Sequence, residues 1–201
     1  KTSPSPKTLP LIRTTRGSHS SGDYSRGNNF PATAVPHGFN FWTPVTDAGV
    51  TNWLYSYHRH NDEQNRPALQ AFALSHQPSP WMGDRHTFHL MPGTGPVERD
   101  RRKRALAFSH DDETASPHHY GVRFANGMTA DLAPTSHAAI MRFTFPDKHG
   151  WLLFDNVRNR VYAVTRKGGK WTRAALPAPS RFGTVSVDAI DADESDDYFM
   201  A

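Results

Sequence analysis

Two stretches of alternating apolar and polar residues, joined by a turn dipeptide, constrain the fold of this chain more than any other feature. Apolar side chains occupy every second position in residues 120–124 and again in residues 128–132, and Asn126-Gly127 lies between them. A period of two places apolar side chains on one face of a strand. Asn-Gly favours the positive φ angles that a type I′ turn requires. The pattern therefore predicts an antiparallel hairpin.

Further strand signals follow along the chain. Residues 141–145 alternate in the same way, and residues 151–154 are a short apolar run typical of a central strand. Residues 160–165 and 171–174 flank Lys167-Gly168-Gly169-Lys170 and predict a second hairpin. Residues 184–187 alternate briefly and predict one more strand.

Proline and glycine divide the chain into short segments. The 201 residues include 16 Pro and 14 Gly, which end helices and favour many brief strands. Only Arg66–Leu74 is expected to form a turn or two of helix, with Pro67 near its start. These signals together predict an antiparallel β-sandwich with long irregular connections in its first half.

Both ends of the chain differ in composition from its middle. Residues 1–26 are rich in Ser, Thr, Pro and Gly without apolar periodicity, and predict a flexible basic leader or linker. Residues 188–201 begin with DAIDADESDD, whose carboxylates repel one another, and predict a solvated acidic tail. A calcium loop is disfavoured there, since the central Gly and the spacing to a terminal Glu are lacking. The β-sandwich domain is therefore expected over residues 27–187.

Composition also excludes several classes of protein. There is no cysteine, which rules out disulfides, a thiolate nucleophile and a cysteine zinc site. No run of about 18 apolar residues is present, and residues 1–26 lack the apolar middle of a signal peptide, so no membrane association is expected. The net charge of +4 is spread out except at Arg99–Arg104. Without a recognised nucleic-acid module, this basic run does not predict nucleic-acid binding.

Four motifs in a fixed order resemble the opening domain of family-92 glycoside hydrolases. They are GNNFPATAVPHG at residues 27–38, Ser75-His76, Met82-Gly83-Asp84, and FSHDDETASP at residues 108–117. The family typically has G-N-T-F-P-G-A-x-V-P-F-G, then S-H-x-x-G-x-G-D, then F-S-H-D-x-E-x-A-x-P-G-Y-Y. This chain departs from the pattern at several positions, which are Asn29 for Thr, Ala32 for Gly, His37 for Phe, and His118-His119-Tyr120 for Gly-Tyr-Tyr. The resemblance extends from about Gly27 to about Asn156.

The resemblance implies a fold and an activity. Members of this family are calcium-dependent exo-α-mannosidases that begin with a β-sandwich of the galactose-mutarotase-like type and continue into a larger helical domain. The catalytic acid, the catalytic base and the calcium ligands come chiefly from that helical domain. The resemblance therefore implies a mannose-containing glycan as substrate, a helical catalytic domain in cis as partner, no catalytic residue and no metal site in this chain, and a secreted or extracytoplasmic protein.

Seven residues are candidates for contacts with the sugar. They lie in the stiff loop at residues 27–38, in the aromatic cluster at residues 52–58, and in the polar and aromatic segment at residues 75–85, and are Asn28, Phe30, Trp53, His76, Trp81, Asp84 and Arg85. The resemblance implies that the first loop borders the sugar pocket and that Trp53 contacts mannose. Each also has a structural interpretation: a loop under the sandwich, an aromatic core, a buried histidine, and for Asp84-Arg85 an ion pair or turn.

Two other clusters suggest chemistry without predicting it. Ser109-His110-Asp111-Asp112-Glu113 combines a nucleophile, a base and carboxylates, but neighbours on a strand point to opposite faces, and a catalytic triad requires contacts in space. The resemblance implies that this motif is mainly architectural. The histidine pairs His58/His60, His86/His89 and His118/His119 lack a third ligand at a recognisable spacing.

The leading hypothesis is the N-terminal substrate-cleft domain of an inverting exo-α-mannosidase, inactive without a following helical catalytic domain. A stand-alone carbohydrate-binding module is the alternative, because an aromatic platform can hold glycans without cleaving them. A third hypothesis is a partner-binding domain that uses the loop Arg101–Arg104.

Overall fold

The structure is a computed structural model, and it describes most of the chain between residues 11 and 175 together with a short segment near the end. The described residues are 11–19, 29–34, 41–50, 54–59, 61–62, 64–75, 88–146, 149–156, 160–167, 170–175 and 197–200, with the backbone alone from residue 156 onward. No helix within these ranges is long and apolar enough to cross a membrane.

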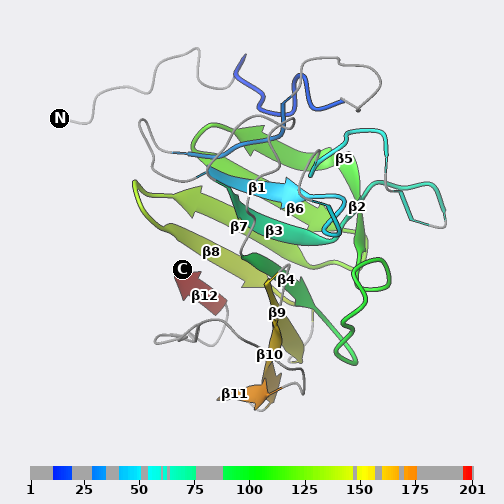
Figure 1. Cartoon of the computed structure of the whole chain (residues 1–201), viewed down its shortest axis with the longest axis vertical. Coiled ribbons are helices and arrows are strands. Elements are labelled where there is room, and N and C mark those ends of the chain that lie inside the picture. The colour runs from blue at the N-terminus through cyan, green and yellow to red at the C-terminus, as the bar shows by residue number, and fades with distance from the viewer. Residues whose placement is uncertain are drawn as a thin grey trace.

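Within the described residues, twelve strands form two antiparallel sheets of six strands each (Figure 1). The first sheet has the order β1 (Phe41–Val45), β3 (Ala71–Ser75), β4 (His89–Gly93), β9 (Gly150–Asn156), β10 (Arg160–Lys167) and β11 (Lys170–Ala175). The second has the order β12 (Asp197–Met200), β8 (Ala139–Thr144), β7 (Thr129–Pro134), β6 (His119–Phe124), β5 (Leu106–Ser116) and β2 (Ala68–Leu69). The predicted all-β antiparallel fold is confirmed.

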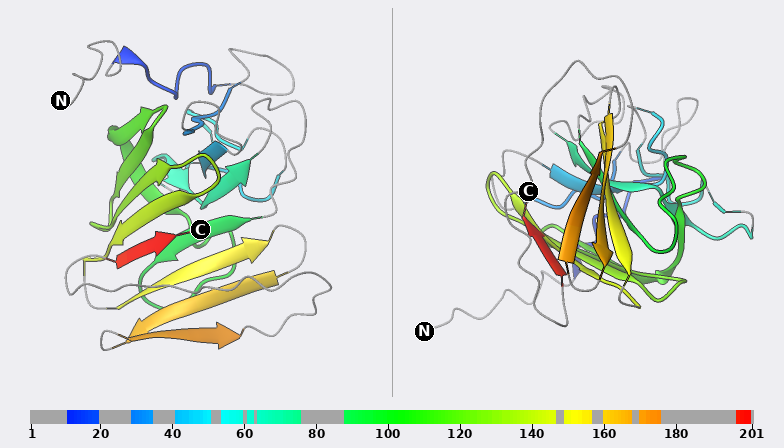
Figure 2. Two further views of the ribbon diagram at one scale, coloured as in Figure 1. Left: turned by 90° about the vertical axis from the view of Figure 1, so that its left-hand side faces the viewer. Right: turned by 90° about the horizontal axis from the view of Figure 1, so that it is seen from below.

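The main hydrophobic core lies between the two sheets. Trp42, Phe72 and Phe154 of the first sheet pack in one cluster with residues of the second sheet such as Tyr120 and Phe143. β1 and β3 lie in front of β6–β8 in Figure 1, whereas β10 and β11 extend beyond the second sheet at the lower end of the molecule in Figure 2. Apolar side chains at every second position of β6, β7 and β8 supply the second sheet's share of the core.

The hairpin predicted at Asn126-Gly127 is confirmed, but the prediction of a type I′ turn is wrong. β6 and β7 pair with Arg123 opposite Thr129, and the Gly127 N–H donates to the Phe124 carbonyl at 2.9 Å. Gly127 has a φ of +88°, whereas Asn126 is not among the residues with positive φ. A type I turn followed by a left-handed glycine forms this three-residue connection, instead of the type I′ turn. The Asn126 side chain accepts the Met128 N–H at 3.1 Å, which stabilises it.

The other strand predictions have mixed outcomes. Residues 151–154 lie in β9, between β4 and β10, as expected for a central strand. The second hairpin is confirmed, because β10 pairs with β11 and Arg166 lies opposite Trp171. The strand expected at residues 184–187 lies outside the described residues.

The helix predicted over Arg66–Leu74 is wrong. This segment instead forms β2 and β3, and every side chain from Ala68 to Ala73 is buried. A helix at a protein surface needs a polar stripe, and this run has none. The segment therefore forms two strands that are buried on both faces. Gln70 separates the two strands and marks the point where the chain passes from the second sheet to the first.

Parts of both predicted terminal segments join the domain. Within the expected flexible leader, the Thr14 N–H donates to Ala115 O on β5 at 3.1 Å, and Ser18 is buried and accepts the Tyr57 N–H through its carbonyl. Within the expected acidic tail, residues 197–200 form β12 and pair with β8. Leader and tail are therefore not wholly separate from the sandwich.

Candidate functional site

Of the seven predicted sugar contacts, Phe30 alone lies within the described residues. Its side chain is 2% exposed and packs in the core between the sheets, which gives it a structural role. The contact between Phe30 and a sugar stays a prediction. The other six lie outside the described residues and are Asn28, Trp53, His76, Trp81, Asp84 and Arg85.

The points where two of the predicted site segments join the sheet lie together. The motif at residues 27–38 leads into β1 at Phe41, and the segment at residues 76–87 follows Ser75, the last residue of β3. Phe41 and Ser75 are register partners in the first sheet. At the far end of the second segment, Phe88 accepts the Leu74 N–H through its carbonyl and contacts the Trp42 ring edge-to-face at 6.3 Å. The residues that flank the two segments, Phe41 and Ser75, therefore lie at one corner of the first sheet.

The attachment point of Trp53 lies at the opposite end of β1. The carbonyl of Leu54 accepts the N–H groups of Thr46 and Asp47, which directly follow β1. β1 has five residues, and a strand rises about 3.3 Å per residue. The two corners are therefore roughly 13 Å apart, measured along the strand.

β5 connects the predicted motifs. The Ala34 N–H of the first motif donates to Pro117 O at 2.8 Å, just beyond the end of β5. Thr33 forms an isolated bridge with Trp42 on β1 and donates its hydroxyl to Ser116 O at 3.5 Å. The first and the last of the four motifs thus touch one another in space.

Glu113 on β5 is a buried carboxylate that receives hydrogen bonds on both oxygens. Its side chain is 2% exposed. The Tyr120 hydroxyl on β6 donates to Oε1 at 2.7 Å, and the Tyr55 hydroxyl lies 2.9 Å from both oxygens. Burial, together with the adjacent negative charge, raises the pKa of Tyr55 and of Tyr120. Both phenols therefore stay protonated and act as donors.

His110 is the third partner of this carboxylate. Its Nδ1 lies 2.8 Å from Glu113 Oε2, and its Nε2 lies 2.9 Å from the backbone oxygen of Tyr57. The ring also stacks on the Tyr57 ring, with centroids 3.6 Å apart and planes 5° apart. Burial opposes a positive charge on His110, but the hydrogen bonds to Glu113 and Tyr57 and the charges of Glu113 and Asp111 outweigh it and raise the pKa of His110.

A bulge in β5 makes this cluster possible. Phe108 pairs with Phe124 and Glu113 pairs with Val122, so five steps along β5 face two steps along β6. Residues three apart on a regular strand point to opposite faces, but the irregularity brings His110 and Glu113 to the same side.

The motif does not form a catalytic triad in the described structure. Ser109 is exposed, and its hydroxyl accepts the Asp111 N–H at 3.2 Å. Both nitrogens of His110 face Glu113 and the Tyr57 carbonyl instead of a serine hydroxyl. The hydrogen bonds from Tyr55 and Tyr120 to Glu113 were not predicted, and the alternation of two tyrosines with Ser56 at residues 55–57 was the available signal for a buried tyrosine.

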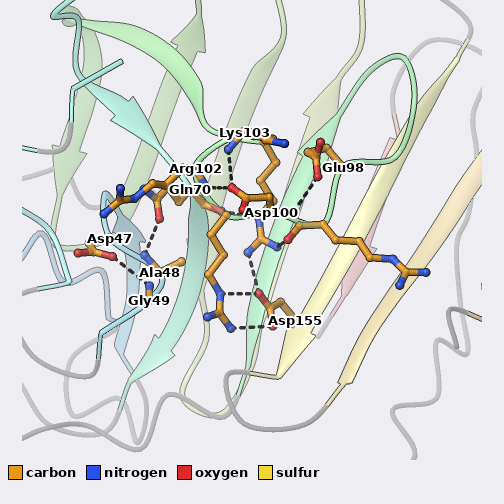
Figure 3. A network of polar contacts seen from close by, with 12 residues as sticks. Asp47, Ala48, Gly49, Gln70, Glu98, Asp100, Arg102, Lys103 and Asp155 are labelled. Atoms are coloured by element: carbon orange, nitrogen blue, oxygen red, sulfur yellow. Dashed lines mark hydrogen bonds and ion pairs between the residues drawn. The ribbon is translucent and has the colours of Figure 1, made fainter. Parts of the chain in front are cut away.

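A second polar cluster lies on the outer side of the first sheet (Figure 3). Asp155 on β9 accepts hydrogen bonds from the guanidinium groups of Arg104 at 2.9 Å and Arg101 at 3.0 Å. Burial alone would raise the pKa of Asp155, but the two arginines outweigh it and lower that pKa. Arg104 also donates from Nε to the Gln70 carbonyl at 3.2 Å. Two of the four cationic side chains in the loop Arg101–Arg104 therefore bind a buried carboxylate of the domain.

An open pocket of about 510 Å³ borders this cluster. Its walls are the turn at Asp47–Val50 and the loop between β4 and β5. Asp100 orders that loop by accepting the N–H groups of Arg102 and Lys103 at 3.0 Å each (Figure 3). The pocket thus combines carboxylates with guanidinium groups, and carries no uniform charge.

The described residues hold no group of three or more His, Asp or Glu side chains that could bind a metal ion.

Comparison with known proteins identifies the family. The model of the glycosyl hydrolase family 92 N-terminal domain matches residues 10–175. This chain belongs to that family. The resemblance seen in the motifs is thus confirmed, and the family 92 domain begins within the segment expected to be a leader.

Solved structures agree with the family 92 assignment. The chain is similar to the family GH92 inverting mannosidase BT2199 from Bacteroides thetaiotaomicron VPI-5482, with 33% identity and a TM-score of 0.65 over 82% of this chain and 24% of that chain. The fold is also that of the family GH92 alpha-mannosidase BT3965 from Bacteroides thetaiotaomicron, with 21% identity and a TM-score of 0.63 over 84% of this chain and 25% of that one. The chain therefore spans about a quarter of the length of these structures. No curated protein matches it.

Proposed function

We propose that this family 92 domain forms one wall of the substrate cleft in a longer inverting exo-α-mannosidase that acts on mannose-containing glycans. The family match over residues 10–175 carries this proposal. It is supported by 33% identity to a protein named as an inverting mannosidase, of which this chain spans 24%.

The state of the two buried carboxylates supports a non-catalytic role for the domain. Inverting hydrolysis needs one carboxylic acid and one carboxylate, which stand roughly 6.5–9.5 Å apart with room for a water molecule. Asp155 is held by Arg101 and Arg104, and Glu113 by two phenols and a histidine. Neither carboxylate is free to exchange a proton with a substrate. As the family resemblance implies, the acid, the base and the calcium ligands would come from a helical domain in cis.

The shared corner at Phe41 and Ser75 supports the proposed sugar contacts. The segment that carries His76 and Trp81 follows Ser75, and the register partner of Ser75, Phe41, closely follows the motif that carries Asn28. Trp53 approaches from the other end of β1. Exposed indole faces suit the apolar face of a pyranose ring, and polar side chains held on short, proline-rich loops suit its hydroxyls.

The proposed glycan substrate places the enzyme outside the cytoplasm. Mannose-containing glycans of this kind are met at cell surfaces and in secretions, and a secreted or extracytoplasmic location follows from that proposal.

A hydrolysis assay of the chain alone tests whether this domain is non-catalytic without the helical domain. We expect no release of 4-nitrophenol from 4-nitrophenyl α-mannoside by residues 1–201, with or without calcium, and calcium-dependent release by the polypeptide that includes the helical domain. Calcium-dependent turnover by residues 1–201 alone would refute the proposal.

Titration with mannose tests the contacts. We expect weak binding by residues 1–201, with backbone amide shifts confined to the segments that carry Asn28, Trp53, His76 and Trp81. His76→Ala should remove the shifts, whereas His118→Ala, an exposed histidine in the turn between β5 and β6, should leave them unchanged. Shifts that persist in His76→Ala and vanish in His118→Ala would contradict this assignment.

A further inference from the structure

His110 sits between two groups that can only accept a hydrogen bond. Nδ1 faces the carboxylate of Glu113 at 2.8 Å, and Nε2 faces the carbonyl of Tyr57 at 2.9 Å. A neutral imidazole has one N–H donor and one nitrogen lone pair. In either neutral tautomer, one of these short contacts would therefore set a lone pair against an acceptor.

An additional proton removes this conflict, and the surroundings indicate where it resides. On Glu113, the proton would give a neutral acid that donates to Nδ1. The same carboxyl group, however, already accepts hydrogen bonds from the phenols of Tyr55 and Tyr120. Hydrogen bonds donated to a carboxylate favour its ionised form. The proton therefore belongs to His110, and the pair is an imidazolium and a carboxylate.

This pair fastens one segment of the chain to β5. Residues 54–59 are bound through the Tyr57 carbonyl to Nε2, through the Tyr57 ring stacked on the imidazole, and through the Tyr55 hydroxyl to Glu113. The segment begins at Leu54, the residue that directly follows Trp53.

We propose that His110 is a positioning residue which, as a doubly protonated imidazolium, holds residues 54–59 on β5 and so fixes the base of the loop that carries Trp53. The link to sugar binding rests on the proposed function, whereas the protonation state does not.

Other titratable groups among the described residues lie around His110. Asp111 comes from β5 itself, and Tyr120 comes from β6 through Glu113. His58 contacts the ring of Tyr57 edge-to-face at 4.7 Å, and His19 contacts His58 in the same way at 4.7 Å. The two described groups that contact the ring nitrogens are the carboxylate of Glu113 and the carbonyl of Tyr57, and both favour the cationic form of the imidazole.

The ring nitrogens of His110 test the inference directly. In the chain labelled with ¹⁵N-histidine, we expect both nitrogens of His110 to have the shifts of a protonated ring at pH 7.5, where an unperturbed histidine is neutral, with its pKa of about 6.5. The resonance is assigned in the wild-type chain by its cross-peaks to the Tyr57 and Phe108 rings, which lie within 3.6 and 5.2 Å of the imidazole centroid. A neutral ring at this pH would overturn the inference.

A matched pair of variants distinguishes the direct contact of His110 with Glu113 from the general effect of a nearby negative charge. Glu113→Gln should shift the His110 titration to lower pH by at least one unit. Asp112→Asn removes the same charge from an exposed position on the same strand and should leave it within a few tenths of a unit. Equal shifts in both variants would contradict a direct pair, and the wild-type measurement stands if Glu113→Gln does not fold.

A reporter on Trp53 tests the positioning role. With 5-fluorotryptophan incorporated and Trp53 assigned through Trp53→Phe, its ¹⁹F signal should move over the same pH range as the His110 ring. A Trp53 signal that does not change over the pH range in which the His110 ring titrates would overturn the positioning role. If both observations hold but mannose leaves the Trp53 signal unchanged, the sugar-binding function fails and the positioning inference stands.

Discussion

Arg104 and Asp155 lie 51 positions apart in the sequence and form a 2.9 Å ion pair whose side chains are 0% and 3% exposed. Asp155 belongs to β9 of the first sheet, and Arg104 ends the loop that leads into β5 of the second. The pair therefore ties the two layers together from the outer side of the first sheet.

Arg104→Met should lower the free energy of unfolding by about 3 kcal/mol, because it leaves a buried carboxylate with one partner instead of two. The value is at the low end for such a change, since Arg101 stays in place. Urea unfolding followed by tryptophan fluorescence measures the loss. Arg102→Met, at an exposed position of the same loop, should change stability by less than about 0.5 kcal/mol. Equal losses in the two variants would contradict the importance of the pair.

Acid should weaken the domain through Asp155. Burial alone would raise the pKa of Asp155, but Arg101 and Arg104 outweigh it and lower that pKa below its ordinary value. A lowered pKa in the folded state adds stability that is complete above the unfolded value of about 3.9 and is lost as the pH falls through the folded value. The stability advantage of the wild type over Asp155→Asn should therefore shrink between pH 5 and pH 2. An advantage that is constant over this range, measured by urea unfolding at each pH, would argue against it.

Tyr55→Phe should cost about 1–3 kcal/mol, because the ring stays while the buried Glu113 loses one of its donors. Tyr57→Phe serves as the control, since it removes a hydroxyl of the same kind and keeps the ring that stacks on His110. Thermal unfolding of both variants gives the comparison. If the control loses as much stability as Tyr55→Phe, the hydrogen bond to Glu113 is not the cause.

Gly127→Ala should destabilise the hairpin of β6 and β7 by about 1 kcal/mol, because a φ of +88° strains any residue with a Cβ atom. Gly127→Asn should cost less, since asparagine tolerates the left-handed region better. Chemical denaturation ranks the three proteins. An alanine variant as stable as the wild type would mean that the turn adopts another conformation.

Local patterns predicted the sheet well where one strand face is buried and the other exposed. Residues 120–124 and 128–132 alternate clearly, and they form neighbouring strands. The pattern failed at Arg66–Leu74, because an apolar run buried on both sides has no period from which helix and strand can be told apart. The prediction of the turn type was also wrong, because Asn-Gly occurs in more than one type of hairpin turn.

The site was predictable only in part, and for a physical reason. Motif order identified the family, and its first and last motifs meet at the end of β5. The cluster around Glu113 depends on a bulge and on Tyr55, 58 positions away in the sequence, and the pairing of Arg104 with Asp155 depends on how the sheets are stacked. Contacts of this kind arise from tertiary packing, to which neighbouring residues in the sequence give no local signal.

Gln70 has a consequence for how the domain acquires its structure. Its N–H donates to Val45 O at 2.8 Å, its side chain accepts the Ala48 N–H at 2.9 Å, and its carbonyl accepts from Arg104. Because one uninterrupted stretch supplies the edge strand β2 to one layer and the inner strand β3 to the other, neither layer is complete while the other is unformed. The sandwich should consequently assemble and come apart in a single all-or-none step, without a stable half-built form.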